Sequence, residues 1–428
     1  MSVKKKTRII LWNMNYIVDA GSPNIGDRAL LYSIISAIKD SGRDVEIIVF
    51  SSDPDVVLRE FEVCGVKYRP LNLTKILYEL WHCDVFVFAG GEVVVDRGSA
   101  LYTPFMLHAA FLVKLLRKKI MGYGIGIGEQ DEISRLGKIL TRMIFSNTTV
   151  SVRDIKSKES LLAMCKPKSI HCTADPVINL KPVSKEEIDS YLATIGVVKN
   201  GKPLVAVVPR QLLMPLNKIS DRVCNIIPIK LREKMKLTPQ NFNDKIAAFQ
   251  KNIAGISDYL VDKYDAEILF VPMFSGFMSY NDDVMCKDII KKMKWSSMAK
   301  IIDNNLAAGA FKALFGRMDL VIGFPLHSII FSTSMGVPVI SFSYESKVER
   351  YMKALNFEKY NFNVKDINHE IHFDHVVDTI DNVMNNRESI KKQLINNITV
   401  LKDIERENVR LLFQNHSVNQ KQVKHAPK

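Results

Sequence analysis

Two doubly wound α/β domains that face a cleft, followed by a helical C-terminal segment, are the architecture that the sequence predicts. Strand-like apolar runs alternate with helix-like periodicity in both halves of the chain. At 428 residues the chain is too long for one average domain of roughly 100 to 200 residues. The 47% hydrophobic and 25% charged fractions are typical of a folded globular protein. We expect domains at residues 1–185 and 195–365, and a helical extension with a loose basic tail at 366–428.

The first half contains apolar strand candidates separated by amphipathic helix candidates. The strand candidates are residues 8–14, 45–51, 84–91, 119–128 and 149–154, and the helices are expected at 27–42 and 103–119. Strands that are apolar along their whole length, with helices between them, predict a parallel sheet covered on both faces. This half is therefore expected to be a Rossmann-like domain.

The pattern relaxes around residues 176–203, where proline and charge increase, and then repeats. Strand candidates follow at 204–210, 267–273, 320–324 and 338–344, with helices at 244–264, from Asp282 and from Ser328. After residue 365 the chain is expected to be helical, and residues 416–428 to form the loose tail. In doubly wound sheets ligands bind at the carboxyl ends of the strands, so polar side chains that follow a strand candidate are candidate site residues.

The net charge and the cysteine content limit which classes of partner and which cellular compartment are expected. The net charge of +13 favours phosphorylated substrates or an anionic membrane surface, and no nucleic-acid-binding motif is present. Six scattered cysteines without C-x-x-C spacing indicate neither a zinc site nor a disulfide framework. No apolar run approaches the roughly 18 residues of a membrane span. We expect a cytoplasmic protein, with peripheral contact at the inner face of the membrane left open.

The run "GYGIGIG" at residues 122–128 does not predict a dinucleotide cofactor. Its glycines lack the G-x-G-x-x-G spacing and alternate along a strand instead of opening a helix. A strand that another part of the chain approaches closely explains them better. We expect no cofactor and no metal.

Polar and glycine residues follow two strand candidates of the first half. Asn24, Gly26 and Asp27 open the first helix, where Asp27 can cap the helix, accept a sugar hydroxyl or act as a base. Gly90 and Gly91 keep the end of a later strand open, although a plain turn also explains them. These five residues are the candidate acceptor-binding set.

Three charged positions allow both a functional and a structural interpretation. Arg153 ends a strand before Asp154, so it can clamp an anion or form a structural pair. Arg210 ends the first strand of the second domain, where a planar guanidinium suits a phosphate or carboxylate. The run Asn281 to Asp283 enters a helix, where capping competes with metal binding.

His327 lies at a strand-helix junction, where backbone N–H groups and the helix dipole favour an anion. Its imidazole can also transfer a proton near neutral pH, whereas a lone histidine is commonly structural. Tyr344 and Lys347 follow the next strand, so they are expected to converge with His327 and Arg210. This convergence makes the strand ends of the second domain the candidate site.

The ordered set "NIGDRALLYSIISAI", "FAGGEVV", "GIGIGE", "SVRDIKSKESL", "ADPVINL", "YNDD" and "LVIGFPLHSIIFSTSMGVPVISFSYESK" resembles the polysaccharide pyruvyl transferase family over residues 24 to about 350. The resemblance implies a fold similar to two-domain glycosyltransferases of the GT-B type. It also implies transfer of a pyruvyl group from phosphoenolpyruvate to a saccharide acceptor, which can be lipid-linked, with formation of a ketal in surface polysaccharide biosynthesis.

Carried over by position, the resemblance implies that Arg210, Leu326 and His327 contact the donor. We add Lys347 and Arg153 as further donor-binding cations, and we assign catalysis to His327 and Asp27. Where the family pattern reads Arg-Leu-His, this chain reads Pro325-Leu326-His327. A lost charge-assisted hydrogen bond costs about 1.5 to 3 kcal/mol, so another cation must compensate or another donor is used. The alternatives are a GT-B-like glycosyltransferase that uses a nucleotide sugar, and a catalytically silent glycan-binding or assembly protein.

Overall fold

In the computed structural model the chain forms two compact units. Unit 1 comprises residues 1–22, 30–176 and 401–428, and unit 2 comprises residues 23–29 and 177–400. Residues 23–29 therefore belong to unit 2, although they precede most of unit 1 in the sequence. The structure describes residues 6–13, 17, 24–69, 72–96, 100–197, 201–210, 242–275, 281–303, 305–364 and 373–414.

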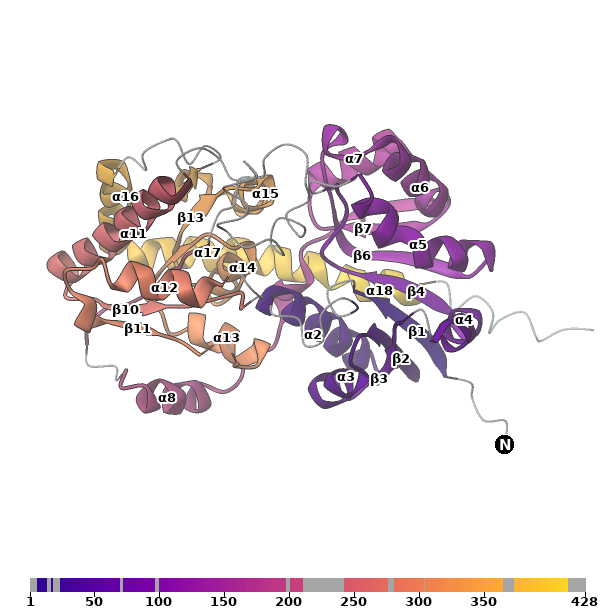
Figure 1. The fold of residues 1–428 in the computed structure, drawn as a ribbon, viewed down its shortest axis with the longest axis horizontal. Helices are drawn as coiled ribbons and strands as arrows, with labels where there is room; N and C mark the ends of the chain where they lie inside the picture. The colour runs from indigo at the N-terminus through magenta and orange to yellow at the C-terminus, as the bar shows by residue number, and fades with distance from the viewer. Residues whose placement is uncertain are drawn as a thin grey trace, which may run out of the picture. The chain divides into compact units, whose positions relative to one another are not determined.

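Unit 1 contains an eight-stranded sheet in which every described strand pair is parallel (Figure 1). Its order is β3-β2-β1-β4-β6-β7-β8, and β5 pairs with β6 beyond the end of β4. The strands are β1 (Thr7–Trp12), β2 (Val45–Ser51), β3 (Cys64–Lys67), β4 (Val85–Ala89), β5 (Glu92–Val94), β6 (Lys119–Ile127), β7 (Thr149–Val152) and β8 (Ser169–Cys172).

Helices cover both faces of this sheet, because successive strand residues point to opposite sides. One core packs Ile9 and Leu11 against α2 (Ile25–Asp40), α3 (Pro54–Phe61) and α18 (Glu407–Phe413). The other packs Ile10 and Trp12 with buried residues of α4, α5, α6 and α7. The bounds of this second group are α4 (Leu73–His82), α5 (Tyr102–Leu115), α6 (Arg135–Phe145) and α7 (Ile155–Met164), with the 3-10 helix η2 (Gln130–Glu132) before α6.

Unit 2 contains a six-stranded parallel sheet in the order β11-β10-β9-β12-β13-β14. Its strands are β9 (Leu204–Val208), β10 (Glu267–Phe270), β11 (Ala299–Ile301), β12 (Leu320–Gly323), β13 (Val339–Ser343) and β14 (Asn361–Asn363). The helices between and around them are α8 (Lys185–Thr194), α11 (Phe242–Tyr264), α12 (Asp282–Ile290), α13 (Ala308–Phe315), α14 (Leu326–Ser334) and α15 (Ser346–Ala354). Short 3-10 helices are η3 (Pro176–Asn179), η4 (Ser296–Met298) and η5 (Glu358–Tyr360).

The C-terminal part is helical, as predicted, in α16 (Phe373–Asn385), α17 (Arg387–Glu405) and α18. Two parallel sheets with alternating helices and this helical segment confirm the predicted fold class. The tail predicted at residues 416–428 lies outside the described residues. Within the part of the chain that the structure describes, no helix is both long and apolar enough to cross a membrane.

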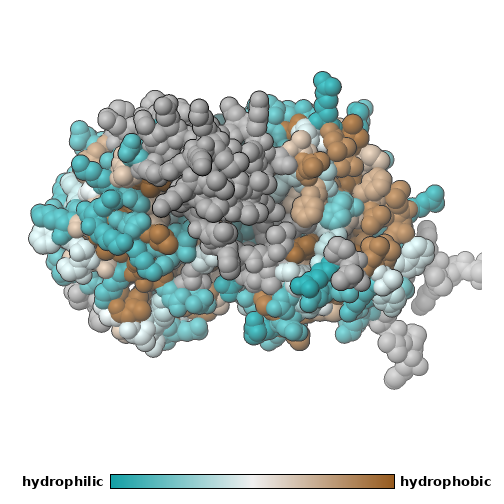
Figure 2. Space-filling view, in the orientation of Figure 1, coloured by the Kyte–Doolittle hydropathy of each residue, from teal (hydrophilic) through white to brown (hydrophobic). Residues whose placement is uncertain are grey.

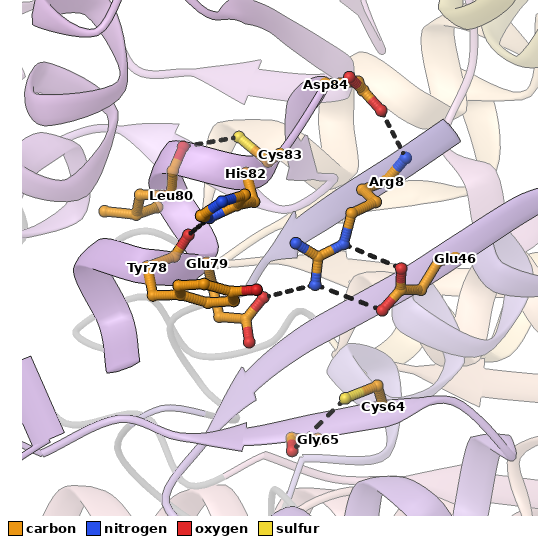
Figure 3. A network of polar contacts seen from close by, with 10 residues as sticks. All are labelled: Arg8, Glu46, Cys64, Gly65, Tyr78, Glu79, Leu80, His82, Cys83 and Asp84. Carbon is orange, nitrogen blue, oxygen red and sulfur yellow. Dashed lines mark hydrogen bonds and ion pairs between the residues drawn. The ribbon is translucent and has the colours of Figure 1, made fainter. Parts of the chain in front are cut away.

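A polar network joins the amino ends of the strands in unit 1 (Figure 3). The Arg8 guanidinium donates to Glu46 at 2.8 Å and to Glu79 at 2.8 Å, and the Arg8 backbone N–H donates to Asp84 at 2.9 Å. Arg8 and Glu46 are also register partners across β1 and β2. Because these groups lie at the amino ends, they stabilise the edge of the sheet opposite to the one where ligands bind.

Candidate functional site

The carboxyl ends of three adjacent strands of unit 2, β9, β12 and β13, bring most of the predicted donor-binding residues to one edge. In the sheet β9 lies between β10 and β12, and β13 lies beyond β12. Arg210 follows β9, Leu326 and His327 follow β12, and Lys347 follows β13. The carboxyl ends of parallel strands lie at the same edge of the sheet. Residues that follow these strands therefore share this edge, although they are far apart in the sequence.

Arg210 is the best-defined group of this edge. Its Nη1 donates to Oδ2 of Asp282 at 3.2 Å, and its guanidinium lies 4.8 Å from the ring centre of Phe274. The Arg210 side chain is 20% exposed, whereas that of Asp282 is 1% exposed. Tyr344 and Glu345, which follow β13, also act on Arg210 electrostatically. The guanidinium is therefore held in place by a buried carboxylate and an aromatic face.

The electrostatic environment keeps Arg210 charged. Burial alone would lower the pKa of its guanidinium, but Asp282, Tyr344 and Glu345 raise it above the usual value. For Asp282, burial raises the pKa of the carboxyl, while Arg210 and the backbone N–H groups of Met273 and Phe274 oppose the rise. Arg210 can thus offer a permanent positive charge to an anion at this edge.

His327 lies in the first turn of α14. The helix was predicted to begin at Ser328; it begins at Leu326, with Pro325 as the N-cap at φ −71° and ψ 136°. The backbone N–H of Ser328 donates to the Pro325 carbonyl at 3.1 Å, and the Ser328 hydroxyl donates to the same oxygen at 2.7 Å. His327 is thus part of the first helical turn, whose backbone N–H groups lie at the positive end of the helix dipole.

The first turn of α2 packs against His327 within unit 2. The Ile25 N–H donates to the Met273 carbonyl at 3.2 Å, and Asn24 forms an antiparallel bridge with Phe274. A β-carbon added to Gly26 would lie 1.9 Å from Nδ1 of His327, so the Gly26 backbone is in close contact with the imidazole. Asn24 and Gly26, predicted on the acceptor side, are therefore neighbours of donor-side residues.

Asp27 is not the N-cap residue of α2, because the helix begins at Ile25. The Asn24 side chain takes that position, because its Oδ1 accepts the Gly26 N–H at 3.0 Å. Asp27 lies inside the first turn, where its negative charge suits the positive end of the helix dipole. Residue preference alone does not distinguish the two positions, since Asn and Asp are about equally good caps. The residue at which the helix begins makes Asn24 the cap.

Lys347 lies in the first turn of α15, which begins at Ser346, and forms an ion pair with Glu345. Its side chain is 17% exposed. Arg210 and Lys347 thus each have a carboxylate partner in the structure. An anionic ligand at this edge would compete with Glu345 for Lys347, because Glu345, at 34% exposed, is more accessible than Asp282.

Arg153 lies in unit 1 and is surrounded by carboxylates. Its guanidinium lies 3.4 Å from Glu92, 3.8 Å from Asp154 and 3.5 Å from Asp175, and its side chain is 7% exposed. A β-carbon on Gly126 would lie 2.8 Å from Nη2 of Arg153. This confirms that a glycine of the "GYGIGIG" strand admits a close neighbour. The surrounding negative charge favours the structural interpretation of Arg153 over an anion clamp.

Gly90 and Gly91 also lie in unit 1, at the end of β4. Both have left-handed backbone angles, with φ values of 67° and 72°. The Gly91 carbonyl accepts the Gly126 N–H at 2.7 Å. This bond joins the turn between β4 and β5 to β6. The two glycines are thus needed for the backbone path, and an acceptor role for them stays a prediction.

Sequence reasoning missed the partners of Arg210. Asp282 was weighed only as a cap or metal ligand, whereas Asn281 caps α12 by accepting the Asp283 N–H and Asp282 pairs with Arg210. Phe274 carried no signal, since an isolated aromatic residue is usually core. Across the described ranges, no cluster of three His, Cys, Asp or Glu side chains is arranged to hold a metal ion.

Comparisons with known proteins agree with this architecture. A glycosyltransferase from Rickettsia africae ESF-5 matches with a TM-score of 0.58 and 14% identity over 96% of this chain and 99% of that chain. MnaA of S. aureus, solved with UDP, matches with a TM-score of 0.58 and 11% identity over 99% of both chains. UDP-GlcNAc 2-epimerase from Methanocaldococcus jannaschii matches with a TM-score of 0.53 and 14% identity over 89% of this chain and 93% of that chain. These similarities confirm the predicted GT-B-like fold.

The comparison with curated proteins gives no match. A family model described as polysaccharide pyruvyl transferase matches residues 24–346. The matched range includes the first turn of α2, Arg210 and the start of α14, all of which contribute to the edge described above. Since this range is also well over half of the sequence, the chain belongs to the polysaccharide pyruvyl transferase family.

Proposed function

We propose that the protein transfers a pyruvyl group from phosphoenolpyruvate to a saccharide and forms a ketal, as a cytoplasmic step of capsule or exopolysaccharide biosynthesis. The observation that carries this proposal is that Arg210, held in its charged form by Asp282, and His327 lie at the same edge of the sheet of unit 2. Phosphoenolpyruvate carries a phosphate and a carboxylate, which require a cationic clamp and helix N–H groups.

The donor-side groups divide the work by their chemistry. Arg210 is a bidentate donor for the carboxylate or phosphate, and its orientation is fixed by Asp282. His327 and the N-terminus of α14 receive the phosphate or supply the proton. Lys347 is the cation that can exchange its carboxylate partner for the donor and so replace the arginine that Pro325 displaces. Arg153 remains a weaker candidate because carboxylates surround it.

The proposed reaction balances without a cofactor. A protonated acid, with His327 as the candidate, gives a proton to the methylene carbon of phosphoenolpyruvate, and the neighbouring carbon becomes oxocarbenium-like. The first saccharide hydroxyl adds to that carbon and returns a proton to the base. The second hydroxyl then displaces phosphate and loses its proton, so that one ketal and one inorganic phosphate are formed. Asp27 is the candidate base for an acceptor hydroxyl.

The test is to incubate the full chain with phosphoenolpyruvate and lipid-linked or free saccharides, and to measure phosphate release together with the mass gain of the glycan. Wild type should release one phosphate for each pyruvyl group gained. His327→Ala and Arg210→Lys should each lower turnover at least tenfold, because an acid or a clamp contributes on that scale.

Matched substitutions separate this result from damage to the fold. His375→Ala changes an exposed histidine of α16, and Arg317→Lys changes the arginine that pairs with Asp189, so both should keep wild-type turnover. No turnover of phosphoenolpyruvate with any acceptor would contradict the proposal. Transfer from a nucleotide sugar would then support a glycosyltransferase, and glycan binding without turnover would support a silent binding protein.

A further inference from the structure

An apolar surface covers the outer side of α5 and α6 in unit 1. Figure 2 shows apolar residues gathered over the part of unit 1 where Figure 1 places these two helices. Monomeric proteins rarely expose large contiguous apolar patches without a partner. We call this surface the α5–α6 face, and its main members are Leu101, Phe105, Leu115, Leu136, Ile139 and Met143.

In α6 the apolar side chains point to solvent in helical register. Leu136, Ile139 and Met143 are 47%, 56% and 47% exposed, and their spacing of three and four residues places them on one side of the helix. The opposite side of α6 buries Ile144 and Phe145 in the core of unit 1. The helix is thus apolar toward both the core and the solvent.

The second helix continues the same surface. Leu101, Phe105 and Leu115 are 67%, 45% and 65% exposed, and they recur at intervals of four and ten residues along α5 and its N-cap. The Lys114 ammonium donates to the carbonyls of Ile144 and Ser146 at 3.1 and 2.8 Å, which ties α5 to the end of α6. The two helices that carry the face are thus fixed to each other.

Positive charge alone accompanies this apolar face on the two helices. Exposed Arg135 and Arg142 and half-buried Lys138 lie on α6, and neither α6 nor residues 101–119 contains an acidic residue. Arg117 and Lys118 follow α5. The nearest acidic residues in sequence are Asp96 and those at residues 129–132, all outside both helices; the Asp96 carboxylate accepts the backbone N–H groups of Thr103 at 2.8 Å and Ser134 at 2.7 Å.

We propose that the α5–α6 face binds an anionic lipid bilayer. An interfacial helix buries its apolar side chains at the acyl boundary while its lysines and arginines contact anionic headgroups. The exposed apolar residues of this face match the acyl boundary, and the lysine and arginines of α6 between them match the anionic headgroups. A second copy of the chain fits less well, because a two-fold interface over this face would bring the cations of α6 near the same cations of the partner copy. This inference does not depend on the proposed pyruvyl transfer.

The test is flotation of the full chain with phosphatidylcholine vesicles that contain or lack phosphatidylglycerol, in the absence of donor and acceptor. Wild type should bind the anionic vesicles and bind neutral vesicles at least tenfold more weakly. The triple variant Leu136→Gln, Ile139→Gln and Met143→Gln should lower the partition coefficient at least tenfold, and Arg135→Gln with Arg142→Gln should remove the preference for anionic lipid.

The control carries the same chemical change at equally exposed apolar positions elsewhere. Leu58→Gln, Val284→Gln and Val400→Gln alter residues that are 59%, 52% and 58% exposed on α3, α12 and α17, and should leave binding unchanged. Equal thermal melting of both triple variants shows that each is folded. The proposal is overturned if wild type binds neither vesicle, or if the α6 triple variant binds as wild type does. It is also overturned if sedimentation shows a dimer that this variant dissolves.

Discussion

Gly26 leaves room for His327: a β-carbon at position 26 would lie 1.9 Å from Nδ1, 2.5 Å from Cγ and 2.7 Å from Cε1 of the imidazole. Real β-carbons essentially never come that close to another atom, so any other residue at this position displaces the ring. The bridge between Asn24 and Phe274 holds this turn in place. Gly26 is therefore a positioning residue for His327.

Gly26→Ala should lower turnover at least tenfold and lower the melting temperature. The loss of turnover is expected because the methyl group moves the imidazole, and a misplacement of about 1 Å can cost on the order of 10²-fold in rate. Stability should fall because overpacking costs about 1 to 3 kcal/mol, which the better helix propensity of alanine, roughly 1 kcal/mol, offsets only in part. Steady-state kinetics and thermal unfolding of the same preparation measure both quantities.

Gly42→Ala, just past the end of the same helix, should change stability without changing turnover. Gly42 has φ 66° and open space around it, so alanine there is strained without touching His327. We expect a loss of about 1 kcal/mol in stability and unchanged turnover. Wild-type turnover in Gly26→Ala would show that the position of the ring is unimportant.

The ion pair between Arg210 and Asp282 predicts separate effects on stability and donor binding. Arg210→Met should cost about 3 to 5 kcal/mol in unfolding free energy, because it leaves the 1% exposed Asp282 carboxylate unpaired. Adding Asp282→Leu should recover most of that stability, because a well-packed apolar pair is often as stable as a buried ion pair. The Michaelis constant for phosphoenolpyruvate should stay raised in the double variant. A double variant that regained normal donor affinity would exclude Arg210 as the clamp.

The position of Arg210, His327 and Lys347 at one edge of the sheet could be predicted because it follows from local patterns and one topological rule. Each residue stands directly after an apolar run that reads as a strand, and in a parallel sheet such ends share an edge. The first residue of α14 was harder to predict, because nothing in the apolar pattern indicates that Pro325 is the N-cap. Boundaries move by one or two residues with details of capping that apolar periodicity does not carry.

The neighbours of these residues could not be predicted, because they depend on contacts between distant segments. Nothing local in residues 24–27 indicates pairing with Met273 and Phe274, about 250 positions later. Likewise, two of the three carboxylates around Arg153, those of Glu92 and Asp175, come from other segments, whereas only Asp154 is its neighbour in the sequence. Spacing in sequence shows which residues are available at a strand end, but it does not show which opposite charges also reach them.

Lys119 should make the stability of the protein depend on pH above neutrality. Burial, and then the nearby charge of Lys168, lower the pKa of Lys119 to about 8, while its ammonium donates to the Leu412 carbonyl at 2.7 Å. The unfolded chain holds this proton up to a pH of about 10.4, so between pH 8 and 10.4 the unfolded state binds more protons. The contribution of Lys119 to unfolding free energy therefore rises with pH in that window and is smallest below pH 8.

Chemical unfolding of wild type and Lys119→Met across this range isolates the effect, because the other titrating groups are common to both proteins. Wild type should gain stability relative to the variant as the pH rises from 8 to 10. Below pH 8 the difference should be flat, apart from the constant contribution of the bond to Leu412. Parallel curves over the whole range would show that Lys119 titrates normally.

Pro325→Arg should tighten phosphoenolpyruvate binding about tenfold or more, because it adds one charge-assisted donor beside His327. The backbone tolerates the change: φ −71° and ψ 136° suit any residue, and the Ser328 N–H and hydroxyl bond only to the carbonyl of residue 325. Pro325→Ala is the matched control, since it removes the ring without adding charge and should leave the Michaelis constant for the donor unchanged. If arginine and alanine have the same effect, the pocket beside His327 accepts a donor other than phosphoenolpyruvate.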